Sequence, residues 1–245
     1  MLDSYSITDT GENRTVNQDF IFASNKPVGI LPNLYIVADG MGGHNAGDFA
    51  SKCAVEVLIN ELQNLNFYDN EDVTVLDVVS SAIQKANEIV YKISLVKEGT
   101  AGMGTTLVVA TCDGDKLQVF NVGDSRLYVM KDEIQQITED HSYIEEMIRL
   151  YGMDRNQMEM NKDKNKITRA IGVEMEVEID YFEVEIEKGM YVLMCTDGLT
   201  NMIDDEIIEQ KLSTRHTIMQ KVIDLVETAN YNGGLDNISV ILVRI

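Results

Sequence analysis

Two pairs of helical segments enclose most of a long series of short strand segments, and this order restricts the fold more than any other feature of the sequence. Apolar residues recur at steps of three and four in four segments: 46–63, 74–93, 204–212 and 217–230. This spacing is typical of the buried face of an amphipathic helix. The strand candidates between the pairs are separated by turns of hairpin length, which predicts antiparallel pairing. Since helices and strands do not alternate singly, a doubly wound parallel sheet is disfavoured.

We therefore expect an α+β fold in which helix pairs cover antiparallel sheets in a layered sandwich. The 245 residues contain no Pro/Gly/Ser-rich linker, low-complexity tract or internal repeat, so we interpret 1–245 as a single domain. A short helix is expected over 141–151, followed by a mobile surface segment at 153–166. The strand candidates are 4–8, 20–23, 34–38, 105–112, 116–122, 126–131, 134–137, 177–187, 191–195 and 238–243.

The charge of the chain limits its partners. Forty-one acidic against 20 basic residues give a net charge of −21, which repels nucleic acid and anionic membranes, so neither is an expected partner. Cys53, Cys112 and Cys195 are far apart in apolar surroundings and are interpreted as reduced core residues. There is no signal peptide and no apolar run near the ~18 residues of a membrane span. We expect a soluble, cytoplasmic protein.

Five aspartates stand where a strand candidate meets a loop, and glycine lies beside or near most of them. One follows the apolar run 34–38 and is followed by three glycines within four positions. Carboxylates that converge repel one another unless a cation holds them, and oxygen ligands select hard ions such as Mg²⁺ or Mn²⁺. Two such ions ~4 Å apart can activate water and neutralise a phosphoryl group. The five are Asp19, Asp39, Asp124, Asp197 and Asp236.

Other catalytic mechanisms lack their motifs. A cysteine phosphatase needs an arginine six positions after the cysteine, but Asn201 stands six positions after Cys195. The chain has no nucleotide P-loop, no complete dinucleotide fingerprint and no Gly-x-Ser-x-Gly nucleophile turn. It also lacks the acid spacing of an EF-hand, which a calcium-binding protein without catalysis would be expected to show. Metal-assisted hydrolysis is therefore the leading class.

Eight short motifs, in one order between residues 11 and 239, resemble those of the metal-dependent protein serine/threonine phosphatases of type 2C. The likeness is greatest to the compact bacterial members. The motifs are Arg14-x-x-Asn17-Gln18-Asp19, Asp39-Gly40-Met41-Gly42-Gly43-His44, Gly104-Thr105-Thr106, Val122-Gly123-Asp124-Ser125-Arg126, Asp140-His141-Ser142, Thr168-Arg169-Ala170-Ile171-Gly172, Thr196-Asp197-Gly198-Leu199 and Asp236-Asn237-Ile238-Ser239.

This resemblance implies a fold and an activity. The fold would be a four-layer α/β/β/α sandwich of two antiparallel sheets flanked by helix pairs, with the metal ions at one end. The activity would be hydrolysis of phosphoserine and phosphothreonine on proteins by metal-activated water. The cofactors would be two Mn²⁺ or Mg²⁺ ions per active site and a third, weaker ion.

The resemblance also implies a role for each acid. Asp39 would bridge two ions and the Gly40 carbonyl would share in binding them. Asp197 and Asp236 would complete one ion's shell, and Asp124 with Asp197 would hold the third ion. The expected metal ligands are Asp19, Asp39, Gly40, Asp124, Asp197 and Asp236, with Asp19 acting mainly through bound water.

Arg14 matches the family's phosphate-binding arginine, whose planar fork suits phosphate oxygens. Two departures concern the catalytic groups. Gln18 stands where animal members have glutamate, and Met41 stands where they have histidine directly after Asp-Gly. His44, three positions later, is left as a candidate general acid. Residues from about 143 to 166 match the variable flap beside the site.

The implied enzyme is a bacterial signalling phosphatase. Its partners would be phosphoproteins, including a serine/threonine kinase and its targets, and we expect a monomer. The alternative is a catalytically weak or inactive module of the same fold that acts by binding; such a module would lack metal-binding acids, and all five are present. A regulatory phosphatase that switches transcription factors usually carries a sensor domain, for which 245 residues leave no room.

Overall fold

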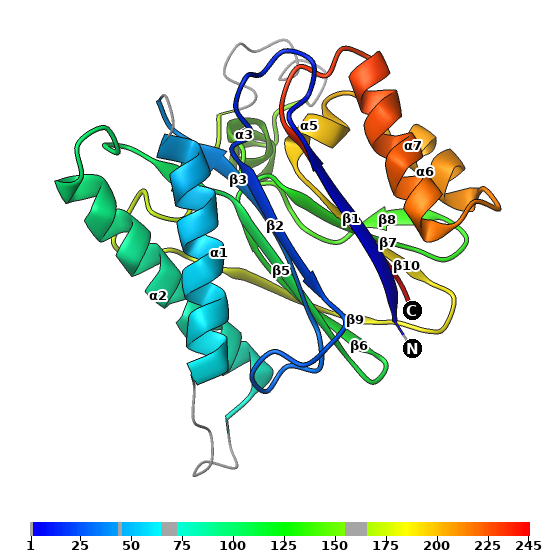
Figure 1. Ribbon diagram of the computed structural model, residues 1–245, viewed down its shortest axis with the longest axis horizontal. Helices are drawn as coiled ribbons and strands as arrows, with labels where there is room; N and C mark the ends of the chain where they lie inside the picture. The colour runs from blue at the N-terminus through cyan, green and yellow to red at the C-terminus, as the bar shows by residue number, and fades with distance from the viewer. Residues whose placement is uncertain (1, 44–45, 65–72, 155–165) are drawn as a thin grey trace.

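The computed structural model describes residues 2–43, 46–64, 73–154 and 166–245, which form two facing antiparallel sheets (Figure 1). One sheet has the strand order β2-β3-β5-β6-β9, with the short β4 paired to the end of β3, and the other has the order β1-β11-β10-β7-β8. The strands of the first sheet are β2 (Asp19–Ser24), β3 (Leu34–Met41), β4 (Gly104–Thr105), β5 (Leu107–Asp113), β6 (Lys116–Val122) and β9 (Asp180–Glu185). Those of the second are β1 (Asp3–Asp9), β7 (Arg126–Met130), β8 (Ile134–Gln136), β10 (Tyr191–Cys195) and β11 (Ile238–Arg244).

One helix pair covers the outer face of each sheet (Figure 1). The first sheet is covered by α1 (Ala46–Asn64) and α2 (Val75–Val96), and the second by α6 (Asp205–Ser213) and α7 (Ile218–Tyr231). Two shorter helices, α3 (Tyr143–Tyr151) and α5 (Asp197–Thr200), lie at one end of the sheets, and the two termini lie at the other. The expected α/β/β/α arrangement is confirmed.

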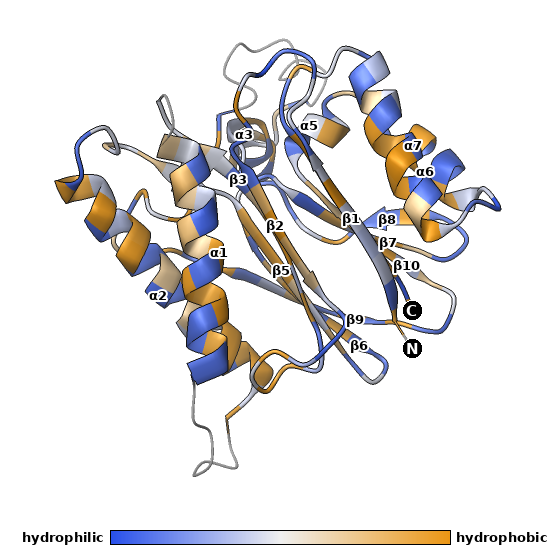
Figure 2. Ribbon diagram, viewed as in Figure 1, coloured by the Kyte–Doolittle hydropathy of each residue, from blue (hydrophilic) through white to orange (hydrophobic). Residues whose placement is uncertain are grey.

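Three apolar layers hold the four structural layers together. On β3, Ile36 packs toward α1 and α2, whereas its neighbours Tyr35 and Val37 pack between the two sheets. Successive side chains of a strand point to opposite faces, so a strand in the middle of the sandwich is apolar on both. Figure 2 shows this as continuous hydrophobic colour along the inner strands and one hydrophobic face on each covering helix. The cysteines are all free, with Cys112 and Cys195 buried and Cys53 partly buried.

Side-chain caps set where several helices begin. The expected helices at 74, 204 and 217 each start one residue later, because the first residue is the N-cap. The Thr74 side chain accepts a hydrogen bond from the Asp77 backbone N–H, and the Asp77 carboxylate accepts one from the Thr74 N–H. Such a capping box satisfies N–H groups that the first helical turn leaves unpaired.

Four predicted boundaries are wrong, and tertiary contacts explain most of them. The strand expected to end at Ala38 continues to Met41, because Gly40 and Met41 pair with β4. The strand expected over 105–112 is divided at Thr106, whose N–H donates to the Asp39 carbonyl instead. The turn expected after β10 is the short helix α5. The exposed strand expected over 177–187 is only β9, flanked by buried Val177 and Ile186.

The segment expected to form a flap, about 143–166, is described in part. It begins as α3, whose N-cap is Ser142 and whose C-cap is Gly152 in the left-handed conformation. Residues 155–165, and with them most of the expected mobile segment, lie outside the described residues. Across the part of the chain that the structure describes, no helix is long and apolar enough to cross a membrane.

Candidate metal centre

Asp19 and Asp39 lie directly opposite each other across the β2–β3 pair. Asp19 is only 7% exposed. One of its carboxylate oxygens, Oδ2, accepts hydrogen bonds from the hydroxyls of Thr196 (2.9 Å) and Ser239 (2.7 Å), which come from the opposite sheet. Asp19 therefore links the two sheets through one oxygen, while its Oδ1 is buried without a partner.

The backbone of Asp39 is fixed by two threonines. Its N–H donates to Thr106 Oγ1 (2.8 Å), and its carbonyl accepts from the Thr106 N–H and the Thr105 hydroxyl (both 2.8 Å). These bonds continue β3 beyond the apolar run and hold the carboxylate at a set position. Gly40 follows where only glycine fits, since a Cβ there would lie 2.0 Å from the Gly47 carbonyl oxygen.

The other three aspartates lie on connections that meet at this end of the sheets. Asp124 is in the turn between β6 and β7, Asp197 is the first residue of α5, and Asp236 precedes β11. The α5 and Asp236 connections are in close contact, because a Cβ on Gly198 would lie 1.9 Å from the Asn237 carbonyl oxygen. All five predicted acids are thus brought to one end of the sandwich.

Burial and mutual repulsion raise the pKa of these carboxyl groups. Burial, then the nearby charges of Asp19 and Asp197, raise the pKa of Asp39 well above its usual value. Burial is also the main cause that raises the pKa of Asp19 to about 7 and that of Asp124 to about 8, and it raises the pKa of Asp197. A protein that places four such carboxyls together disfavours their charged form unless a cation is bound.

Three buried oxygens of the cluster have no hydrogen-bond partner among the residues that the structure describes: Asp19 Oδ1, Asp124 Oδ1 and Asp197 Oδ1. Leaving a buried polar atom unpartnered is unfavourable by about 1–3 kcal/mol, and more if it is charged. Carboxylate oxygens are the ligands that Mg²⁺ and Mn²⁺ prefer. The donor set therefore fits a hard divalent cation.

The acids do not form a finished coordination shell. Within residues 2–43, 46–64, 73–154 and 166–245, no three acidic, histidine or cysteine side chains are grouped closely enough to hold a metal ion as they stand. Uncompensated carboxylates repel, so a spread arrangement is expected before a cation draws them together.

Arg14 and His44 are the two predicted catalytic residues besides Asp39. The guanidinium of Arg14, about half exposed, donates to Asp236 Oδ2 at 2.8 Å, so the arginine reaches the centre while paired with one of the predicted ligands. This pairing was not expected from the sequence. His44 lies outside the described residues.

Sequence reasoning missed several residues that build the centre. Asn237 accepts from the Gln18 N–H (2.8 Å) and donates to the carbonyls of Thr10 and Val16, so it fixes the loop that carries Arg14. The quoted motifs include Asn237, Thr106, Thr196 and Ser239, but a motif does not show which neighbour an amide or hydroxyl binds.

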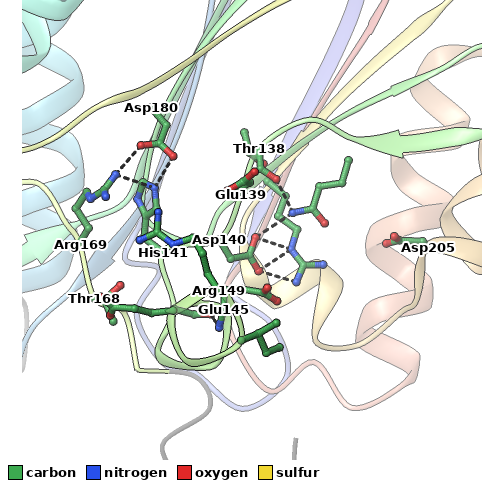
Figure 3. Close-up of a pocket in the computed structure, with 15 residues that line it drawn as sticks. Thr138, Glu139, Asp140, His141, Glu145, Arg149, Thr168, Arg169, Asp180 and Asp205 are labelled. Atoms are coloured by element: carbon green, nitrogen blue, oxygen red, sulfur yellow. Dashed lines mark hydrogen bonds and ion pairs between the residues drawn. The ribbon is translucent and has the colours of Figure 1, made fainter. Parts of the chain in front are cut away.

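A polar cavity of about 770 Å³ lies beside the Asp124 turn (Figure 3). Two ion pairs line it: Arg126 binds Asp140 through two nitrogens, and Arg169 binds Asp180 at 2.6 Å. Both arginines are thus paired with acids. His141, between the two pairs, is 8% exposed, and burial is the main cause that lowers its pKa, which favours the neutral imidazole.

Two antiparallel sheets between helix pairs, with aspartates gathered at one end, define the architecture of the metal-dependent protein phosphatases. The family model described as Protein phosphatase 2C matches residues 10–238, and the chain belongs to this family. The chain is 36% identical over 243 residues to the serine/threonine phosphatase stp of Listeria monocytogenes serotype 4b, covering 97% of this chain and 93% of that protein.

Solved structures of serine/threonine phosphatases also resemble this chain. The S. agalactiae serine/threonine phosphatase matches with a TM-score of 0.91 and 34% identity, covering 100% of both chains. The catalytic domain of the serine/threonine protein phosphatase PstP, solved in complex with two manganese ions, matches with a TM-score of 0.82 and 28% identity, covering 99% of this chain and 97% of that one.

Proposed function

We propose that this protein is a metal-dependent serine/threonine phosphatase that hydrolyses phosphoserine and phosphothreonine on proteins. The observation that carries the proposal is the set of buried, unpartnered carboxylate oxygens of Asp19, Asp124 and Asp197 near Asp39, whose pKa is raised by burial and then by the charges of these acids. Membership of the Protein phosphatase 2C family and likeness to named serine/threonine phosphatases support it.

In this proposal the acids share the work of holding two Mn²⁺ or Mg²⁺ ions. Asp39 would contribute to both ions, the Gly40 carbonyl would supply a main-chain oxygen, and Asp197 and Asp236 would complete the set. Asp19 would contribute mainly through bound water, and Asp124 with Asp197 would hold a third, weaker ion. The ions lower the pKa of water and neutralise phosphoryl charge when bound. The related PstP domain with two manganese ions favours this metal over magnesium.

Arg14 binds the substrate phosphate. Its partner in the structure is Asp236 at 2.8 Å, a proposed metal ligand, and a carboxylate that binds a cation attracts the guanidinium less. The fork of Arg14 then turns to two oxygens of the phosphate, whose geometry it matches. His44 remains the candidate for protonating the leaving serine or threonine, with water as the other source of that proton.

The substrates are phosphoproteins, including a serine/threonine kinase and its targets, and we propose that the enzyme acts in the cytoplasm as a monomer. The strongly acidic chain, with 41 acidic residues against 20 basic ones, disfavours nucleic-acid and anionic-membrane partners. The binding-only alternative predicts a protein that retains phosphoprotein affinity but has no turnover.

The test is hydrolysis of a phosphothreonine peptide by the purified protein with Mn²⁺, followed by addition of a chelator. We expect turnover that stops in chelator and returns with excess Mn²⁺. Turnover that survives chelation would refute the metal mechanism. Binding without turnover at any metal concentration would favour the inactive module.

A further inference from the structure

His141 is joined to Gly123 by two hydrogen bonds. The Gly123 N–H donates to the imidazole Nδ1 at 3.0 Å, and the His141 backbone N–H donates to the Gly123 carbonyl at 3.0 Å. Because Nδ1 accepts, it carries no proton, and the neutral ring has its proton on Nε2. Nε2 lies 3.1 Å from Asp180 Oδ2, so the ring is held from both sides.

Gly123 is the residue before Asp124, and its conformation leaves little freedom. Its φ is +107°, a left-handed value that favours glycine. A Cβ there would lie 2.6 Å from Thr106 Cγ2. Thr106 itself accepts from the Asp39 N–H and is hydrogen-bonded to Ser125 at 2.7 Å. The turn that carries Asp124 is therefore fixed on one side by the residue that fixes Asp39, and on the other side by His141.

The far side of the imidazole is also anchored. Arg169 donates to Asp180 Oδ1 at 2.6 Å and to Glu178 Oε2 at 2.9 Å, and its Nη1 lies 3.0 Å from His141 Nε2 (Figure 3). The His141 carbonyl accepts from the Thr168 N–H at 2.8 Å. The ring thus connects the Asp124 turn to the start of β9 and to the strand segment that carries Arg169.

We propose that His141 is a positioning residue, whose Nδ1 holds the Gly123 N–H so that the unpartnered oxygen of Asp124 stays directed at the metal centre. This inference rests on the proposed function, because it assigns Asp124 an ion to hold. His141 itself touches neither metal nor substrate. Groups that orient metal ligands commonly change metal affinity by about 10–100-fold when replaced, and an effect through one backbone turn should lie near the lower end.

Two substitutions of His141 distinguish the role of Nδ1 from that of Nε2. In His141→Asn the side-chain oxygen takes the position of Nδ1 and can still accept from Gly123, whereas in His141→Gln the amide reaches toward Asp180 and the acceptor is lost. His216→Gln is the matched control, since His216 is half exposed and paired with Asp224. Mn²⁺ binding is titrated by calorimetry and by electron paramagnetic resonance of free Mn²⁺, with Asp124→Asn marking the weak ion.

We expect H141Q to weaken the Asp124-dependent ion by about tenfold, with the two tighter ions unchanged and with H141N and H216Q close to the wild type. Equal weakening in H141N and H141Q, or none in either, would overturn the inference. The inference would also be overturned if the D124N variant bound Mn²⁺ in the same way as the wild type. A wild type that binds no Mn²⁺ at all would instead refute the proposed function, and the inference with it.

If a variant fails to fold, the hydrogen bond between Gly123 and His141 can be tested in the wild-type protein. A hydrogen bond from a backbone N–H to an imidazole nitrogen gives a scalar coupling between the two nitrogens. We expect this coupling between Gly123 N and His141 Nδ1 in the ¹⁵N-labelled wild type. A protonated Nδ1, or no coupling, would overturn the inference.

Discussion

Two groups of acids lie at the same end of the sandwich and differ in whether their carboxylate oxygens have partners. In the cavity, Asp140 and Asp180 are each paired with an arginine. In the metal centre, Asp19, Asp124 and Asp197 each have a buried oxygen without a partner.

The pKa shifts of the two groups of acids also differ in direction. Burial raises the pKa of Asp180, but its bonds to His141 and Arg169 outweigh burial and the net pKa is lowered. At Asp19 in the metal centre, burial outweighs the hydrogen bonds from Ser239 and Thr196, and the pKa rises to about 7. The contrast supports the proposal that the paired acids stabilise the fold itself, whereas the acids that each have an unpartnered oxygen hold a cation.

The largest expected effect follows from removing the central acid. Asp39→Asn should lower kcat by about 10³-fold, because a catalytic metal contributes several kcal/mol and each 1.36 kcal/mol is tenfold in rate. The measurement is steady-state hydrolysis of a phosphothreonine peptide at saturating Mn²⁺.

Asp132→Asn, in the exposed turn between β7 and β8, is the control and should leave kcat unchanged. The same Asp39→Asn protein should be more stable than the wild type without metal, since asparagine replaces a carboxyl whose charged form is disfavoured by burial and by the neighbouring carboxylates. If the Asp39→Asn variant kept normal turnover, the assignment of Asp39 to the metal centre would be wrong.

The second effect is a pH dependence of stability in the metal-free protein. Burial raises the pKa of Asp19 to about 7 and that of Asp124 to about 8 in the folded state, from an ordinary value of 3.8. Between about pH 4 and 8 the folded state therefore binds more protons than the unfolded state, so the free energy of unfolding should fall as the pH rises.

A fall of at least about 3 kcal/mol between pH 5 and 8 is expected, because Asp19 alone spans about two pH units of this range below its pKa and each unit corresponds to 1.36 kcal/mol. It is measured by urea unfolding in chelator, and added Mn²⁺ should abolish most of it. A stability that rises with pH in chelator would contradict the raised pKa values.

The third effect tests the paired acids. Arg126→Met should lower the free energy of unfolding by about 2 kcal/mol, because it leaves Asp140, whose side chain is only 10% exposed, without its cation. The matched control is Lys131→Met, which breaks the exposed Lys131–Glu187 pair and should change stability by less than about 1 kcal/mol. If the two variants lose the same stability, burial is not what distinguishes the pairs.

The smallest effect concerns Arg14, which is bound to the metal-centre acid Asp236. Arg14→Ala should raise KM for the phosphopeptide by about tenfold, as for the loss of one charged contact, with a smaller change in kcat. Arg14→Lys should recover only part of the affinity, since an ammonium lacks the planar fork. An unchanged KM in Arg14→Ala would show that Arg14 serves Asp236 alone.

Much of the fold could be predicted from short-range patterns. The stripe that includes Val79, Ile83, Ala86 and Val90 predicts α2, and these residues are buried against α1 and the first sheet. The hairpin spacing around Gly114 predicts the β5–β6 pair, in which Asp113 and Lys116 are partners across a two-residue turn. Periodicity is a local property, so a single sequence is enough to show it.

The acids of the candidate metal centre could be predicted from the sequence, but their partners could not. That five aspartates stand near strand ends is visible in the sequence, but Asp39 is within β3 and faces Asp19 across the β2–β3 pair, which the sequence does not show. The hydroxyls on Asp19 come from residues 177 and 220 positions away. No pattern of spacing shows which distant side chain will meet another, since that depends on how the two sheets are stacked.

The sequence by itself determined the elements, the antiparallel pairing and which residue types could meet a divalent cation, because periodicity, turn chemistry and ligand chemistry are local. Only the tertiary structure decided which acids are paired and which are not. Asp140 and Asp180 meet arginines, whereas the oxygens of Asp19, Asp124 and Asp197 meet none. The physical reason is that burial and charge neighbours are properties of the packed sheets, and these set the pKa of each carboxyl.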